Sequence, residues 1–327
     1  MIGRDAAAPV VAVGLQAIQH RGQDSAGIGT LDGGRLRLAK GMGLVQQAVP
    51  LETLAALEGR ASIGHVRYPT AGRDATREDA QPFITRRPGI LLAHNGNVTN
   101  VPELQDQLQS QGLVVLSQCD AEPILLVLAQ ELTDIRPADH TTEDLVQAVS
   151  RLFARVKGAY SVVALMELDG QTSLVAFRDP HGIRPGVYGR DETGAWMTAS
   201  ESVALDVLGF DKQGDLPVGG VLILREGQDA VVRPVLTPSP RHCVFERIYF
   251  ARTDSRMEDG RINRTRWLLG RRLAKEWSDK GLDADLVMAV PDTSRPAAMA
   301  MAEELGLPNR EGFIKNRYSG RTFIMPD

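Results

Sequence analysis

Three prolines fall within ten residues at positions 233–242 (RPVLTPSPRH), and the pattern of the sequence changes across this segment. Proline fixes φ and has no backbone N–H, so a cluster of prolines marks a connection rather than a helix or a central strand. The chain has 327 residues, which is more than one average core serves. The sequence therefore predicts two domains, covering residues 1–235 and 236–327.

The first part of the chain alternates short apolar runs with helical patterns. Helical spacing of apolar residues and helix-capping pairs predict helices over 9–20, 100–112, 122–132 and 142–156. Strand-like runs cover 26–31, 62–68, 90–94, 160–166, 173–177, 195–199 and 221–225. Strands, then helices, then strands again are typical of a layered α+β domain.

The second part has a different pattern. A helix is predicted over 263–278, where Trp267, Leu268, Leu273, Ala274 and Trp277 share one face. The apolar run 285–290 predicts a buried strand, and a short polar loop then leads to a helix over 295–305 that Gly306 ends. This is the unit from which parallel α/β sheets are built. One such unit does not make a domain, so we expect the sheet to be cut short at Asp327.

Composition excludes several classes of protein. The net charge is −4 and the pI is near 5.9, whereas a nucleic-acid-binding protein normally shows a basic excess. No apolar stretch approaches the ~20 residues that span a bilayer, and the N-terminus has no signal-peptide core. The two cysteines, Cys119 and Cys243, rule out a disulfide framework and an all-cysteine zinc site, and they suit the cytoplasm.

Several polar clusters stand out, and each has an ordinary explanation. Asn95-Gly96 is the dipeptide best suited to a tight hairpin turn, Asp120 precedes an apolar helix as an N-cap would, and Arg67 fits the surface of an edge strand. The clusters are HRGQDSAG (20–27), GHVRYPTAG (64–72), LLAHNGNVTN (91–100) and QCDAEPIL (118–125).

Taken together and in this order, the clusters resemble the glutamine phosphoribosylpyrophosphate amidotransferase family. The resemblance continues through FRDPHGIRP (177–185), ASESVALD (199–206), FERIYFARTDS (245–255), VPDTS (290–294) and IKNRYSGRTFIMP (314–326). It implies an α+β Ntn-hydrolase (αββα) glutaminase domain followed by a truncated α/β type I phosphoribosyltransferase domain. It also implies the first committed step of de novo purine synthesis. In that step, ammonia released from glutamine is added to 5-phosphoribosyl-1-pyrophosphate, giving 5-phosphoribosylamine, glutamate and pyrophosphate.

The resemblance assigns roles to particular residues. The amide of Asn95 and the N–H of Gly96 form an oxyanion hole. The other implied roles concern substrate binding. Arg67 binds the glutamine α-carboxylate, Asp120 binds the α-ammonium, and Thr70 and Arg21 line or orient the pocket. The residues that face the phosphoribosylpyrophosphate are Ser294, Lys315, Arg317 and Arg321. Ser294 also lies at a Mg²⁺ position.

The sequence also departs from the family pattern. The family nucleophile is an N-terminal cysteine that uses its own α-amine as base, whereas this sequence begins Met1-Ile2-Gly3. We therefore expect an upstream segment with that cysteine, and the phosphoribosylpyrophosphate loop beyond Asp327, to be missing, leaving the chain as given inactive. Cys119 is expected to be a buried small hydrophobic residue. Cys243 is the candidate ligand of a [4Fe–4S] cluster that some members of the family carry.

Two other functions are compatible with parts of the sequence. A glutamine-binding pseudo-glutaminase with a regulatory or scaffolding role would also keep the glutamine pocket. An Ntn amidotransferase that makes an amino sugar or an asparagine would not contain IKNRYSGRTF. We favour the phosphoribosylpyrophosphate enzyme. For this enzyme the resemblance further implies purine nucleotides as feedback inhibitors, a homo-oligomer and a cytoplasmic location. It implies no nucleic acid or membrane partner.

Overall fold

The computed structural model describes residues 1–68, 76–258 and 260–316. The chain divides into two compact units, Met1–His242 and Cys243–Asp327. The proline-rich segment stays with the first unit, because Val235 N–H donates to the Gly219 carbonyl, Ser239 N–H to Pro180 and Arg241 N–H to His181. The first unit thus extends to His242, whereas the composition break placed the boundary after residue 235.

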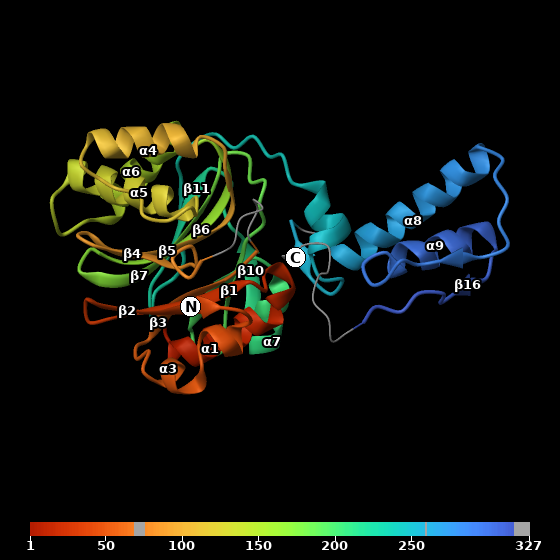
Figure 1. Cartoon of the computed structure of the whole chain (residues 1–327), viewed down its shortest axis with the longest axis horizontal. Helices are drawn as coiled ribbons and strands as arrows, with labels where there is room; N and C mark the ends of the chain where they lie inside the picture. The colour runs from red at the N-terminus through yellow and green to blue at the C-terminus, as the bar shows by residue number, and fades with distance from the viewer. Residues whose placement is uncertain (69–75, 259, 317–327) are drawn as a thin grey trace. The chain divides into compact units, whose positions relative to one another are not determined.

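The first unit consists of two sheets packed between two layers of helices (Figure 1). One sheet is antiparallel throughout, in the order β12-β11-β7-β6-β5-β4. Its strands are β4 (Phe83–Arg86), β5 (Gly89–Val98), β6 (Gly158–Leu168), β7 (Gln171–Arg178), β11 (Gly220–Leu224) and β12 (Val231–Pro234).

The second layer of strands is made of two three-stranded pieces, β2-β1-β3 and β10-β8-β9. Ile2 joins them, because its backbone bridges Ala61 of β3 and Trp196 of β9. The strands are β1 (Ser25–Asp32), β2 (Arg35–Met42), β3 (Ala61–Arg67), β8 (Val187–Arg190), β9 (Trp196–Ala199) and β10 (Asp211–Asp215).

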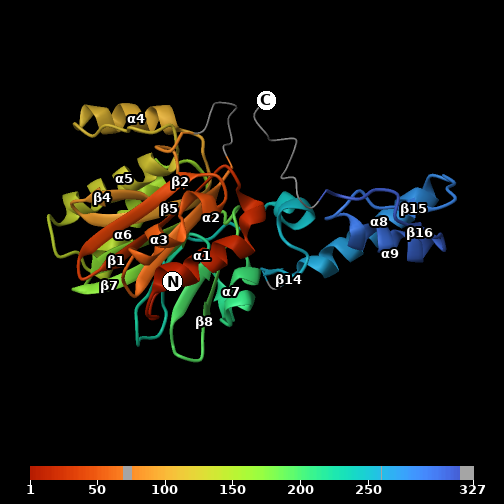
Figure 2. The same ribbon diagram turned by 60° about the horizontal axis from the view of Figure 1, so that its bottom comes forward.

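Helices cover the outer face of each sheet (Figures 1 and 2). The layer over the six-stranded sheet contains α4 (Val101–Ser110), α5 (Ala121–Ile135) and α6 (Thr142–Arg155). The layer over the other sheet contains α1 (Ala7–Ala17), α2 (Val45–Ala48), α3 (Leu51–Ala55) and α7 (Ser202–Leu208), with the 3₁₀ turn η1 (Gln19–Arg21) after α1.

The four layers enclose three apolar cores, one at each junction. The strand β5 shows why, since Leu91 packs between the two sheets while its neighbour Leu92 packs against the helices α5 and α6. Successive side chains of a strand point to opposite faces, so a strand covered on both sides is apolar at every position. This explains the continuous apolar run that the sequence shows at 90–93.

The two capping boxes expected from the sequence have different outcomes. At α6, Thr141 and Asp144 exchange hydrogen bonds as predicted, with Asp144 N–H donating to Thr141 Oγ1 at 3.2 Å. At α4, Asn100 makes no capping bond. Its side chain instead donates to the Arg155 carbonyl at 2.9 Å and accepts from Lys157 N–H at 2.9 Å. A tertiary contact has thus replaced the local one.

The hairpin turn predicted at Asn95-Gly96 is wrong. Both residues lie inside β5, with Asn95 opposite Ser161 and Gly96 opposite Tyr160 of β6. The turn before β5 lies instead at Arg87-Pro88, because Arg86 pairs with Gly89. A long partner strand supplies backbone hydrogen bonds that the local turn propensity cannot match.

The second unit contains the predicted strand and helix, and a second strand that was not predicted follows them. The strand β15 (Val287–Met288) leads through α9 (Arg295–Leu305) to the parallel strand β16 (Asn309–Arg310), and Gly306 ends α9 with a φ of 62°. Before it come the π-helical turn η2 (Glu246–Phe250), the short pair β13 (Arg256–Met257) and β14 (Gly260–Arg261), and the helix α8 (Ile262–Asp279).

One expectation about burial in this unit is wrong. The run 285–290 is not a buried strand, since Met288 is 46% and Val290 70% exposed. The helix α8 buries Arg266, Gly270 and Ala274, while Leu273 on the expected apolar face is 51% exposed. Strands of parallel sheets are buried when both faces are covered, and in the described part of the chain β15 pairs with β16 alone.

Candidate functional site

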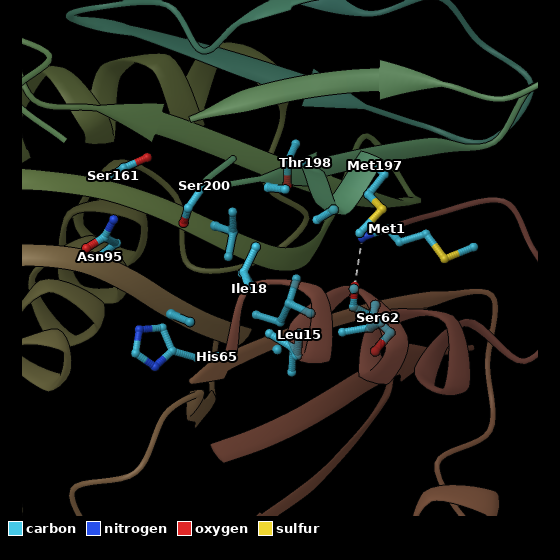
Figure 3. A pocket seen from close by; sticks show the side chains of 18 of the residues that line it. Met1, Leu15, Ile18, Ser62, His65, Asn95, Ser161, Met197, Thr198 and Ser200 are labelled. Atoms are coloured by element: carbon cyan, nitrogen blue, oxygen red, sulfur yellow. Dashed lines mark hydrogen bonds between the residues drawn. The ribbon is translucent and has the colours of Figure 1, made fainter. Parts of the chain in front are cut away.

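Polar side chains gather where β3 and β5 pass close to β6. His65 of β3, His94 and Asn95 of β5, Ser161 of β6 and Ser200 after β9 line a cavity of about 80 Å³. In the view of Figure 3, His65, Asn95 and Ser161 lie along one side of this cavity, and Met1 lies on the opposite side. The motifs 64–72 and 91–100, which are distant in sequence, therefore contribute to one site.

Asn95 has an unused hydrogen-bond donor in this site. Its Nδ2 atom is buried and has no hydrogen-bond partner among the described residues. An unsatisfied buried donor costs about 1–3 kcal/mol, so it needs an explanation such as a bound ligand. Glycine is required at position 96, beside Asn95, because of backbone packing. A Cβ on Gly96 would clash with the backbone of Ala159 and Tyr160, so the close approach is to β6.

Asp120 precedes α5 but does not cap it, because its side chain makes no capping hydrogen bond. One carboxylate oxygen lies 3.0 Å from Nε2 of His94, and the other accepts the backbone N–H of Val98 at 2.9 Å. Burial acts to raise the pKa of Asp120, but His94 and the Val98 N–H outweigh it, so the pKa stays below its usual range. Asp120 is therefore an anion held beside the cavity.

Arg67 ends β3, as the sequence predicts for a strand residue. Its Nη1 atom is buried without a hydrogen-bond partner in the described part of the chain. Its charge reaches both Asp24 and Cys119: burial raises the pKa of each, and Arg67 opposes the rise. The guanidinium therefore acts electrostatically on both groups, and its Nη1 atom retains hydrogen-bonding capacity.

Cys119 precedes Asp120 in the chain and is confirmed as buried, with 2% exposure. Its Sγ is 3.9 Å from Asp120 Oδ1. Burial and the charge of Asp120 raise the pKa of its thiol to about 12. Because the thiolate is the nucleophilic form, Cys119 is an inert thiol. The charges of a cation, Arg67, and an anion, Asp120, thus both act on Cys119, and they are complementary to the two charged groups of an α-amino acid.

Two histidines of this site were not singled out from the sequence. His65 is half-buried, with its Nδ1 atom buried, and burial of the ring, followed by the charges of His94 and Arg67, lowers its pKa to about 3. His94 has a side chain that is 1% exposed and faces Asp120. The sequence contains a signal for both histidines, since they lie within the motifs that carry Arg67 and Asn95. A buried histidine is more often a packing residue, which is why the sequence alone did not select them.

Arg21, expected to orient the glutamine pocket, lies in the turn η1. Its Nη1 donates to the carboxylate of Glu201 at 2.6 Å, and Glu201 is fully buried before α7. Thr70, expected to line the pocket, lies outside the described residues. Glu201 belongs to the motif 199–206 but was not identified from the sequence as a site residue.

The expected phosphate-binding residues belong to the second unit. Ser294 precedes α9, and its hydroxyl donates to the carbonyl of Val290. Lys315 is exposed, and Arg317 and Arg321 lie outside the described residues. The structure therefore describes two of these four residues and does not show them forming a binding cluster.

Both expected metal groups stay predictions. Among the residues described, no group of three or more His, Cys, Asp or Glu side chains could hold a metal ion. A hard cation such as Mg²⁺ prefers several oxygen ligands, of which Ser294 would supply one. A [4Fe–4S] cluster takes four thiolates, of which Cys243 would supply one, since Cys119 is buried.

Comparisons with known proteins agree with this fold. Residues 65–207 match the model of a glutamine amidotransferase domain family. The chain is 45% identical over 322 residues to the amidophosphoribosyltransferase of Pseudomonas aeruginosa and 43% identical over 325 residues to that of Escherichia coli, covering 95% of this chain in each case. A solved glutamine phosphoribosylpyrophosphate amidotransferase from B. subtilis, in complex with ADP and GMP, superposes with a TM-score of 0.84 at 34% identity. That match covers 100% of this chain and 68% of the B. subtilis chain.

The four layers and the polar cluster at β3 and β5 define the class, an Ntn-hydrolase glutamine amidotransferase fold followed by an α/β phosphoribosyltransferase unit. The chain belongs to the amidophosphoribosyltransferase family, whose members act in purine biosynthesis. The fold class expected from the sequence is therefore confirmed. The chain spans 63% of the length of the two curated relatives named above.

No helix in the described part of the chain is both long and apolar enough to cross a membrane.

Proposed function

We propose that this chain takes part in the amidophosphoribosyltransferase reaction. In the first step water hydrolyses the side-chain amide of glutamine, giving glutamate and ammonia, and the first unit binds and positions the glutamine. In the second step ammonia attacks C1 of 5-phosphoribosyl-1-pyrophosphate, the bond to pyrophosphate breaks, and 5-phosphoribosylamine forms. The first unit belongs to the glutaminase part of the enzyme and the second to the phosphoribosyltransferase part. Family membership supports this assignment.

One observation carries the proposal for glutamine: the ionised Asp120 and the Arg67 guanidinium, whose Nη1 atom is buried without a partner in the described residues, both act electrostatically on Cys119. A guanidinium binds a carboxylate with two parallel hydrogen bonds, so Arg67 takes the α-carboxylate. Asp120 takes the α-ammonium. Both charged groups on the α-carbon of glutamine are then fixed, and the side-chain amide extends from them to Asn95 on β5.

Asn95 stabilises the charge that develops during amide hydrolysis. Attack on the amide carbon places negative charge on its oxygen, and pre-aimed donors stabilise that charge more than they stabilise the substrate. The buried Nδ2 of Asn95, without a partner in the described residues, is such a donor. The backbone N–H of Gly96 is proposed as the second donor, held in place because Gly96 packs directly against β6.

The remaining assignments concern the second substrate and regulation. Ser294, Lys315, Arg317 and Arg321 are proposed to face the phosphates of phosphoribosylpyrophosphate, with Mg²⁺ carried mainly by the pyrophosphate oxygens. Purine nucleotides are proposed as feedback inhibitors, a proposal supported by the B. subtilis relative solved with ADP and GMP. We place the protein in the cytoplasm as a homo-oligomer, as the resemblance to the family implies.

Glutamine binding tests the proposal directly. Isothermal titration of the full chain compares L-glutamine with 4-carbamoylbutanoate, which lacks the α-amine. Arg67→Ala should weaken glutamine binding by about 10–100-fold, the range expected for a charge-assisted hydrogen-bond pair. Asp120→Asn should abolish the preference for glutamine over the amine-free compound. Arg225→Ala, which removes a cation paired with Asp169 elsewhere in the unit, is the control and should change neither. Unaltered binding in the Arg67 and Asp120 variants would contradict the proposal.

A further inference from the structure

Glu201 is a buried carboxylate to which the proposed reaction assigns no role. It is 0% exposed and lies at the residue before α7. Its Oε1 atom is 2.7 Å from Nε2 of His20 and accepts a hydrogen bond from Nη1 of Arg21 at 2.6 Å. Burying a carboxylate is unfavourable unless it is paired and hydrogen-bonded. Glu201 therefore ties two neighbouring side chains of η1 to a distant part of the chain.

The turn that Glu201 holds is packed against the backbone of Arg67. Gly22 follows η1, and a Cβ there would clash with the backbone of Val66 and Arg67. Two residues later, the Asp24 N–H donates to the Arg67 carbonyl at 3.1 Å. Residues 19–24 therefore lie directly behind the end of β3, with no room between them.

Arg67 depends on this support because no side-chain partner in the described residues fixes its Nη1 atom. The backbone of Arg67 fixes the point from which its side chain extends, so a shift of that backbone moves the guanidinium relative to the rest of the site. A binding group must be held within about 0.5 Å of its productive position by the residues around it. The turn behind Arg67 is the part of the structure placed to do this.

We propose that Glu201 is a positioning residue of the glutamine site, which fixes the turn 19–24 and through it the direction of the Arg67 guanidinium. The inference rests on the proposed binding of the glutamine α-carboxylate by Arg67. Its chain of contacts runs from the Glu201 carboxylate to Arg21, through Gly22 to the backbone of Arg67. Glu201 itself touches no substrate in this scheme.

The test must separate positioning from a general loss of stability. In the full chain, isothermal titration compares L-glutamine with L-glutaminamide, in which the α-carboxylate is replaced by a neutral amide. The dissociation constant of L-glutaminamide divided by that of L-glutamine measures recognition of the carboxylate alone. Glu201→Gln should reduce this ratio about tenfold, and Glu201→Asp, which keeps the charge, should recover part of it. All titrations are made at a temperature at which circular dichroism shows each variant to be folded.

The matched control is Asp169→Asn, which removes a carboxylate paired at 2.7 Å with Arg225 in the same unit. It should lower the melting temperature and leave the ratio unchanged. If Glu201→Gln does not fold, Gly22→Ala tests the same contact from the other side and should reduce the ratio without altering the carboxylate. The inference would be overturned if the ratio stayed at the wild-type value in the folded Glu201 variants while Arg67→Ala removed the preference for glutamine over glutaminamide. A ratio that Arg67→Ala also leaves unchanged would instead overturn the proposed binding mode.

Discussion

At the scale of single residues, the site is made of groups whose burial changes their chemistry. Asp120 remains ionised because His94 and a backbone N–H stabilise its charge. Cys119, one residue away, is kept protonated because burial raises the pKa of its thiol to about 12. Two adjacent side chains are thus assigned opposite states, one charged and one neutral, by their surroundings.

His65 gives a prediction for the pH dependence of stability. Burial lowers its pKa from 6.5 to about 3, so between these values the unfolded chain binds a proton that the folded chain does not. The free energy of unfolding must therefore fall as the pH decreases from about 6.5 towards 3, by up to about 1.4 kcal/mol per pH unit from this group. His65→Gln removes this contribution.

The measurement is urea unfolding of the two proteins at several pH values between 5 and 7.5. We expect the loss of stability from pH 6.5 to pH 5 to be about 2 kcal/mol smaller in His65→Gln than in the original chain. Parallel curves for the two proteins would show that His65 is accessible to protons in the folded state.

At the scale of elements, β5 decides the geometry of the site. It runs unbroken through Asn95 and Gly96 because β6 pairs with it along its whole length. Asn95 is therefore held by a rigid central strand and not by a mobile loop. The ladder of backbone hydrogen bonds outweighs the local preference of Asn-Gly for a turn.

Gly96→Ala tests this packing. The added methyl group would meet the Ala159 carbonyl and the Tyr160 Cα, and backbone atoms of a central strand cannot move aside. We expect the free energy of unfolding to fall by at least about 2 kcal/mol. Gly89→Ala in the same strand is the control, because its methyl group would lie 3.5 Å from Leu36 Cδ1, an ordinary contact.

Gly89→Ala should change stability by less than about 1 kcal/mol. Chemical denaturation of both variants gives the comparison. Equal and small effects would mean that β5 and β6 can separate locally at Gly96, against the close packing described above.

At the scale of the whole molecule, the two units differ in how much apolar surface they bury. The first unit encloses three cores between four layers. The apolar cluster described in the second unit consists of Ala251, Met257 and Ile262, while Leu268 and Leu273 of α8 are about half exposed. Stability scales with the apolar area removed from water.

We therefore expect the fragment 1–242 to fold alone and to melt in one cooperative transition. The fragment 243–327 should show no cooperative melting and should bind a dye that recognises exposed apolar surface. Differential scanning calorimetry of the two fragments and of the full chain checks this. Absence of a transition in the fragment 1–242 would show that the boundary of the independent unit lies elsewhere.

The sequence by itself determined the fold class and most elements of this protein, because both depend on local patterns. Apolar periodicity located α1, α5, α6, α8 and α9, and the apolar runs located the central strands. The resemblance of the motifs also led to the family that the comparisons show. The strands β2, β4, β8, β10 and β12 were missed because they are short or more polar, and their pairing comes from neighbouring strands.

The tertiary structure alone decided how the motifs act together. It placed Asn95 in a strand, paired Asp120 with His94 where the sequence suggested a helix cap, and joined Arg21 to Glu201 across 180 positions of the chain. It also left Leu268 and Leu273 on the apolar face of α8 about half exposed. Each outcome depends on which distant segments lie side by side, and the energy of a buried charge or an unpaired donor depends on those neighbours rather than on adjacent residues.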